Sequence, residues 1–157
     1  ISASKFINVK IVIAGSGPEE VKLKKQAEDL GIKNIIFAGQ VSDKEKFSLI
    51  KNCTALILPS HLRSEAYGMV LVEASMMGKP MISCEIGTGT SFVNKHEETG
   101  LVVKPENVDE MADAMRIIYN DNTLTQKLGH NARSRYENMF SGKALGKAYS
   151  AVYQELL

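Results

Sequence analysis

Two glutamates, Glu65 and Glu73, lie eight positions apart around the start of an apolar stretch. From Met69 to Met77 the residues are apolar except at Glu73 and Ser75, which predicts a helix that is buried on all sides. A carboxylate inside such a helix is costly unless hydrogen bonds or a ligand compensate for its lost hydration. We therefore interpret Glu73 as a ligand-binding residue.

The first turn of this helix, from Gly68 to Val70, predicts a phosphate site. Its backbone N–H groups lack partners within the helix and carry the positive end of the helix dipole. Glu73, one turn later, could accept hydrogen bonds from a vicinal diol such as a ribose, and Glu65 could hold a second polyol. This arrangement favours a nucleotide-sugar. Two alternatives stay open: Glu73 could pair with a buried lysine or arginine, and Glu65 could be a solvated loop residue.

Short β-branched or apolar runs alternate with helical patterns, which is typical of βαβ units in an open parallel sheet. The predicted strands are Lys10–Ala14, Asn34–Ala38, Thr54–Leu58, Met81–Cys84 and Leu101–Val103, each apolar on both faces. The predicted helices are Pro18–Leu30, Asp43 to about Asn52 with Ser42 as cap, Gly68–Met77, Asn107–Tyr119, Thr123 to about Met139, and Gly142 to the end. We expect an α/β fold with one Rossmann-like, doubly wound parallel sheet and C-terminal helices, in a single domain of residues 1–157.

Ligands of open α/β sheets bind at the carboxyl ends of the strands. The loops to inspect are Gly15–Pro18, Gly39–Ser42, Pro59–Gly68 and Glu85–Ser91. They add further residues to the predicted binding site, namely Gly15, Gly39, Gln40, Val41, Gly87 and Thr88.

Composition argues against several kinds of partner. A net charge of +1 gives no electrostatic case for nucleic acid or an anionic membrane as the main partner. No apolar run approaches the roughly 20 residues that a membrane span needs. His61, His96 and His130 are far apart and no Asp-x-Asp pair occurs, so we expect no metal and no cofactor. Cys53 and Cys84 are interpreted as buried thiols in a reducing compartment.

A dinucleotide site is not favoured, although Gly15 and Gly17 follow a predicted strand. The sixth position of the G-x-G-x-x-G pattern is Glu20, whose side chain would crowd the helix against the strand. Gly39 and Gln40 also stand where an acid for the ribose would be needed.

Several motifs resemble, in order, those of the large retaining glycosyltransferase family four, also called group 1. The motifs are Glu65-Ala66-Tyr67-Gly68 with Glu73-Ala74 (the family's Glu-x7-Glu signature), Gly78-Lys79-Pro80, Ile13-Ala14-Gly15-Ser16-Gly17-Pro18, Phe37-Ala38-Gly39, Leu58-Pro59-Ser60, Glu98-Thr99-Gly100-Leu101-Val102-Val103 and Phe140-Ser141. The resemblance implies a GT-B enzyme with two Rossmann-like domains, in which this half holds the nucleotide-sugar donor. The acceptor domain and the family's first strand would then precede Ile1, and the chain is expected to be a fragment.

The resemblance also implies roles for the site residues. Glu65, the candidate catalytic residue, would contact hydroxyls of the donor sugar, and Glu73 would bind the ribose. The amides of Tyr67, Gly68, Met69 and Val70 would meet the diphosphate or the sugar, and the Gly39–Val41 loop would lie near the base. No residue is assigned as acid or base.

The chain departs from the family at two places. The Arg and Lys that neutralise the diphosphate would also precede Ile1, so the fragment should bind donor weakly. Because it lacks the acceptor domain, the fragment alone is also expected to be inactive. The usual Gly-Gly-x-Pro-Glu is replaced by Gly87-Thr88-Gly89-Thr90-Ser91, which looks similar to some mannosyltransferases of surface-polysaccharide assembly.

We therefore expect retaining transfer of a hexose from a nucleoside diphosphate sugar to a polysaccharide or lipid-linked acceptor, without a metal. The expected location is cytoplasmic, with peripheral attachment to the inner face of the membrane through the preceding half. One alternative is a non-catalytic nucleotide-sugar-binding module. Another is a phosphorylase-like enzyme, for which no cofactor lysine is identified.

Overall fold

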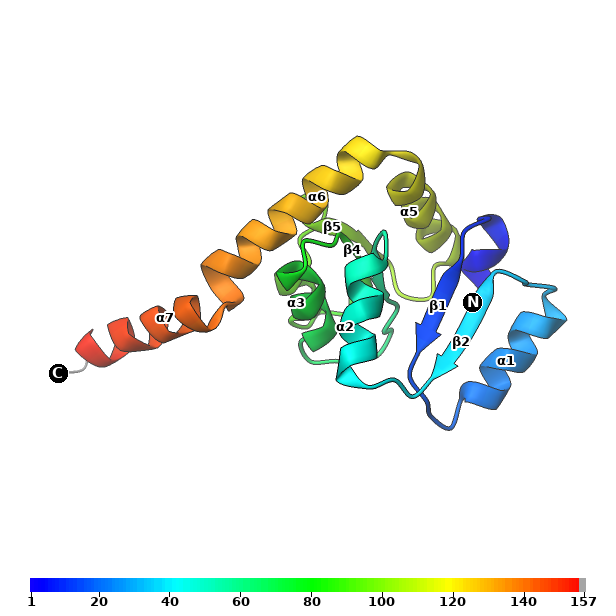
Figure 1. The fold of residues 1–157 in the computed structure, drawn as a ribbon, viewed down its shortest axis with the longest axis horizontal. Helices are drawn as coiled ribbons and strands as arrows, with labels where there is room; N and C mark the ends of the chain where they lie inside the picture. Colours follow the sequence, from blue (N-terminus) through cyan, green and yellow to red (C-terminus); the bar gives the residue numbers. More distant parts are fainter. Residues whose placement is uncertain (156–157) are drawn as a thin grey trace.

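The computed structural model describes residues 1–155 as an α/β fold in which every strand pairing is parallel (Figure 1). β1 (Ile11–Ala14) pairs with β2 (Ile35–Gly39), and β4 (Met81–Cys84) lies between β3 (Leu56–Leu58) and β5 (Gly100–Val103). These strands confirm the five predicted ones, with ends that differ by at most two residues. Because the pairings are parallel, the loops that follow the strands of one sheet leave from the same edge.

The expectation of one continuous sheet is wrong for the described chain, because β1–β2 and β3–β4–β5 form separate sheets. Both sheets nevertheless contact one core cluster, which Ile11 of β1 and Ile57 of β3 each touch. Among the five strands of residues 1–155, β4 alone is buried at every residue. β1 and β2 alternate between half-buried and exposed positions, and Val12 and Ile36 are 41% and 46% exposed. Burial on both faces was expected for all five strands. It is complete in β4, which lies between two other strands, and it is not found in β1 and β2.

The predicted helices are confirmed within residues 1–155, with small shifts at their ends. They are α1 (Glu20–Asp29), α2 (Asp43–Asn52), α3 (Met69–Met76), α5 (Val108–Asn120), α6 (Asn122–Arg135) and α7 (Gly142–Glu155). The last two residues of the helix predicted from Gly142 to the end lie outside the described residues. Ser42 and Glu45 form a reciprocal capping box on α2, and the Asn107 side chain accepts a hydrogen bond from the Glu110 amide at the start of α5. Pro18 was expected at the first helical position, but it lies in a turn before α1.

Three short helices were not predicted: η1 (Ser2–Phe6), α4 (Thr90–Val93) and the π-helix η2 (Tyr136–Phe140). The first two are too short to show a helical period in the sequence. The α-helix predicted to reach Met139 ends at Arg135, and the π-helix η2 takes its place. The centroid of the Phe140 ring at the end of η2 lies 5.9 Å from that of Phe92 and 6.5 Å from that of Tyr67. Packing of Phe140 therefore couples the C-terminal helices to the loop before α3.

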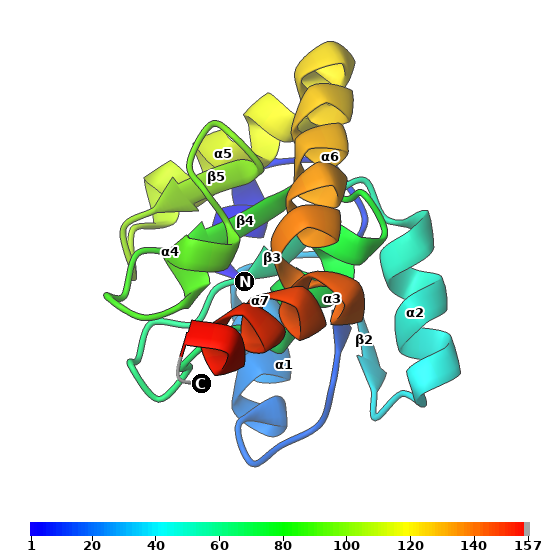
Figure 2. The same ribbon diagram turned by 90° about the vertical axis from the view of Figure 1, so that its left-hand side faces the viewer.

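Two core clusters hold these elements together. One surrounds β4, β5 and α5, and includes Ile82, Leu101 and Met115. The other joins α3 to α6 and η2 through Leu71, Ala132 and Phe140, among others. Figure 2 shows α5 and α2 on opposite sides of β3 and β4, as expected for a doubly wound fold.

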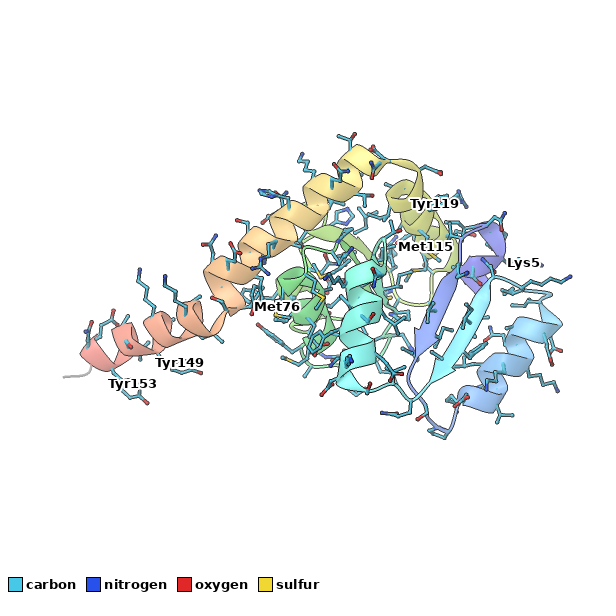
Figure 3. The ribbon with its side chains drawn as sticks, viewed as in Figure 1. Lys5, Met76, Met115, Tyr119, Tyr149 and Tyr153 are labelled. Carbon is cyan, nitrogen blue, oxygen red and sulfur yellow. The ribbon has the colours of Figure 1, made fainter. Side chains whose placement is uncertain are left out.

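Helix α7 extends away from the rest of the chain (Figure 1) and has no buried residue. Its exposed apolar side chains, at Leu145, Tyr149, Val152 and Tyr153, recur at helical spacing. Tyr149 and Tyr153 project from the same side of the helix (Figure 3).

Candidate functional site

The start of α3 depends on Gly68, which is its N-cap and has a φ of 76°. The Glu65 carboxylate accepts a hydrogen bond from the Gly68 amide at 3.0 Å. Glu65 is therefore not a free loop residue, since it already holds the turn that precedes α3. Within residues 1–155 no acceptor is assigned to the amides of Met69 and Val70, so these two N–H groups stay available at the positive end of the helix.

The loops after β3 and β4 contact each other beside this helix end. The Gly89 amide donates a hydrogen bond to the Ala66 carbonyl at 2.9 Å. The Tyr67 ring lies against Gly89, where a Cβ would come within 2.5 Å of it. At Gly87 a Cβ would lie 3.6 Å from Nη1 of Arg63. The structure thus brings the predicted residue Gly87 beside the Tyr67 loop and adds an exposed guanidinium there.

The loops after β1 and β2 form a second part of the predicted site. The Gly15 amide donates to the Gly39 carbonyl at 2.7 Å, and Ser16 Oγ lies 3.0 Å from the side-chain oxygen of Gln40. Val41 then leads into α2. These contacts bring Gly15, Gly39 and Gln40 together, as their positions at adjacent strand ends predict.

The expected burial of α3 on all sides is wrong. Leu71, Ala74 and Ser75 are buried, whereas Met69 is 63% exposed and Glu73 is only partly covered. One face of α3 packs on the second core cluster, whereas Val72, Glu73 and Met76 are only half-buried, which an almost wholly apolar sequence does not reveal.

Glu73 is paired with a cation. Lys46 Nζ of α2 donates to Glu73 Oε1 at 2.7 Å, and the two side chains are 31% and 23% exposed. The pairing with a lysine was one of the open alternatives, but the pair is accessible to solvent and not buried. The hydrogen bond to Glu73 raises the pKa of Lys46 above its ordinary value. Sequence reasoning missed Lys46 because 27 positions separate it from Glu73.

The two hollows described on the surface lie elsewhere. One, of about 380 Å³, is lined by η1 and the turn between α1 and β2. The other, of about 570 Å³, is lined by residues around His96 and reaches Glu85, which follows β4, and Ser91 of α4. Neither of these two hollows is lined by Glu65 or Glu73, and both glutamates are half-buried.

Residues 1–155 contain no group of three or more His, Cys, Asp or Glu side chains placed to hold a metal ion. Over the same range, no helix combines the length and apolar character needed to span a membrane.

Comparison with known proteins identifies the family. The model of the family described as "Glycosyl transferases group 1" matches residues 1–135. The chain belongs to this family. Among curated relatives, the O-antigen chain mannosyltransferase C of Escherichia coli is 37% identical over the whole chain, and the D-rhamnosyltransferase WbpZ of Pseudomonas aeruginosa is 46% identical over 90% of it. The chain spans 42% and 37% of the length of these two relatives.

Solved structures confirm the fold as one half of a GT-B architecture. The Anabaena protein HepE, solved with UDP, matches 98% of this chain with a TM-score of 0.86 and 21% identity, and the chain covers 43% of it. Sucrose-phosphate synthase of Thermosynechococcus elongatus matches 99% with a TM-score of 0.86 and 24% identity, and the chain covers 40% of it. The roles of individual site residues stay predictions.

Proposed function

We propose that this chain is the donor-binding part of a retaining hexosyltransferase that uses a nucleoside diphosphate sugar. Membership of the glycosyl transferases group 1 family supports sugar transfer. The printed names of the two relatives concern mannose and D-rhamnose, and the HepE structure holds UDP. The remaining length of the enzyme would carry the acceptor domain, and the acceptor would be a polysaccharide or a lipid-linked saccharide. Peripheral attachment to the inner face of the membrane remains a prediction for that other half.

One observation carries the proposal: the amides of Met69 and Val70, which have no acceptor within residues 1–155, lie at the start of α3 between Glu65 and Glu73. A diphosphate gains negative charge as it leaves the sugar. Preorganised N–H donors at a helix N-terminus stabilise such charge without a metal ion. The Arg63 guanidinium beside Gly87 would add a second positive group on the same side.

The two glutamates would position the donor and exchange no proton with it. Glu73 would accept hydrogen bonds from the ribose hydroxyls. Glu65 would contact donor-sugar hydroxyls through the carboxylate oxygen that does not bond to Gly68. The Gly39–Val41 loop would lie beside the base.

Titration with UDP-, GDP- and ADP-sugars tests donor binding. Glu73→Gln should weaken binding of the preferred donor by about 1.5 to 3 kcal/mol, because a hydrogen bond to a charged acceptor is lost. Glu28→Gln is the matched control, because Glu28 is an exposed glutamate of α1. Equal affinity of the Glu73 variant and the unchanged protein would remove the ribose role. Turnover by the complete gene product would separate an enzyme from a non-catalytic binding module.

A further inference from the structure

Lys46 joins the helix that follows the proposed base loop to the glutamate of the proposed ribose site. Its ammonium contacts Glu73 of α3 at 2.7 Å and Asp43 of its own helix at 3.3 Å. The nitrogen also lies 4.9 Å from the centroid of the Phe47 ring. Asp43 is 88% exposed, so the contact with Glu73 is the better ordered of the two ion pairs.

Local structure fixes where Lys46 stands. The capping box between Ser42 and Glu45 sets the start of α2, with the Ser42 amide donating to Glu45 at 2.8 Å. Lys46 is the next residue after that box. Its side chain reaches from the start of α2 to Glu73 of α3, and only the capping box separates it from the Gly39–Val41 loop.

The ion pair leaves Glu73 able to bind a ligand. A carboxylate has about four acceptor positions on its two oxygens. Lys46 occupies Oε1, and no hydrogen bond from the described residues reaches Oε2. A partner on one oxygen restricts the rotation of the carboxylate, so the other oxygen samples fewer directions before a ligand arrives.

We propose that Lys46 is a positioning residue that orients the Glu73 carboxylate for the ribose hydroxyls, and so sets the preference for ribonucleotides over deoxyribonucleotides. This inference rests on the proposed donor-binding function. Lys46 would act through Glu73 and make no contact with the donor itself. A direct contact of Lys46 with the diphosphate is a competing arrangement, and it predicts a different dependence on the nucleotide.

The test compares nucleotides that differ only in the sugar hydroxyls. Calorimetry on the complete gene product, with the best-binding nucleoside diphosphate and its 2′,3′-dideoxy form, gives a ratio of affinities. In the unchanged protein the ribonucleotide should bind about 10-fold tighter or better. Lys46→Gln should reduce this ratio by about two- to five-fold, as expected when an exposed ion pair is removed.

Two variants provide the controls. Lys46→Arg should restore most of the ratio, because arginine also binds a carboxylate. Lys44→Gln, an exposed lysine of the same helix, should leave the ratio unchanged. Far-ultraviolet circular dichroism would verify that all variants keep their fold.

The outcomes separate this inference from the proposed function. If Lys46→Gln keeps the full ratio while the nucleotides still bind, Lys46 does not position Glu73 and only this inference fails. Lys46→Gln could instead weaken binding of the nucleoside diphosphate and of its dideoxy form by the same factor, and leave binding of the nucleoside unchanged. In that case Lys46 contacts phosphate, and the inference is again overturned. If the unchanged protein binds no nucleotide, the proposed function fails with it.

Discussion

Replacing Gly68 by alanine tests the geometry on which the site depends. Gly68 has a φ of 76°, in the left-handed region that side chains disfavour. A Cβ there would lie 2.8 Å from Cδ1 of Leu71 and 3.0 Å from Cδ2 of Leu58. Leu71 is fully buried, so it has little room to move away.

The expected cost has two parts. A left-handed conformation costs a residue with a side chain roughly 1 to 2 kcal/mol. Overpacking of a filled core costs about 1 to 3 kcal/mol more. Gly68→Ala should therefore lower the free energy of unfolding by about 2 to 5 kcal/mol, a large part of the roughly 5 to 15 kcal/mol typical of a domain.

Urea denaturation followed by circular dichroism measures this loss, and two other glycines separate its parts. Gly31 has a φ of 66° but no atom within 4 Å of its Cβ position, so Gly31→Ala should lose only the conformational part, about 1 to 2 kcal/mol. Gly17 has neither restriction, and Gly17→Ala should leave stability unchanged or raise it by up to about 1 kcal/mol.

A Gly68 variant no less stable than the Gly31 variant would refute the steric argument. If neither variant loses stability, the left-handed argument itself is wrong. Either result would also weaken the assignment of Gly68 as the residue that fixes the amides of Met69 and Val70.

Two further predictions concern Asn94 and the two thiols, of which Cys84 is buried as expected and Cys53 is only half-buried. The fully buried Asn94 side chain donates to Ser83 Oγ at 2.9 Å and to the Leu101 carbonyl at 3.2 Å, and it accepts a hydrogen bond from Thr99. Asn94→Ala should therefore lower the free energy of unfolding, measured by urea denaturation, by about 2 to 4 kcal/mol. Asn138→Ala, an exposed control, should change stability by less than about 0.5 kcal/mol, and equal losses would contradict the network argument. Burial raises the pKa of the Cys53 and Cys84 thiols, so less thiolate forms below pH 9 than in the unfolded chain. At about pH 8 both should react slowly with a disulfide reagent and faster after unfolding, and rapid reaction in the native protein would show that the thiols are accessible.

Local signals in the sequence determined most elements correctly. Ser42 with Glu45, and Asn107 with Glu110, mark helix starts because side-chain oxygens there satisfy amides that no helix can satisfy. The strands were found because short β-branched runs lie between turn residues. The order of the family's motifs predicted both the family and the fold, which the comparisons confirm.

Contacts between distant positions could not be predicted in this way. The alternating exposure of β1 and the separation of the two sheets depend on what lies beside each strand edge. The π-helix at Tyr136–Phe140 depends on the space that Tyr67 and Phe92 leave for the Phe140 ring. Tyr67 and Phe92 are both far from Phe140 in the sequence, so no local pattern reveals their contact with it.

The glutamates of the candidate site show the same division. Their spacing around Gly68 was enough to predict a carboxylate on each side of a helix start, because that depends on residues close in the chain. The bond of Glu65 to the Gly68 amide, the exposure of Met69 and the pairing of Glu73 with Lys46 were decided only by the tertiary structure. The partners of a charged side chain are set by which helices pack together, and α2 and α3 meet only in the folded protein.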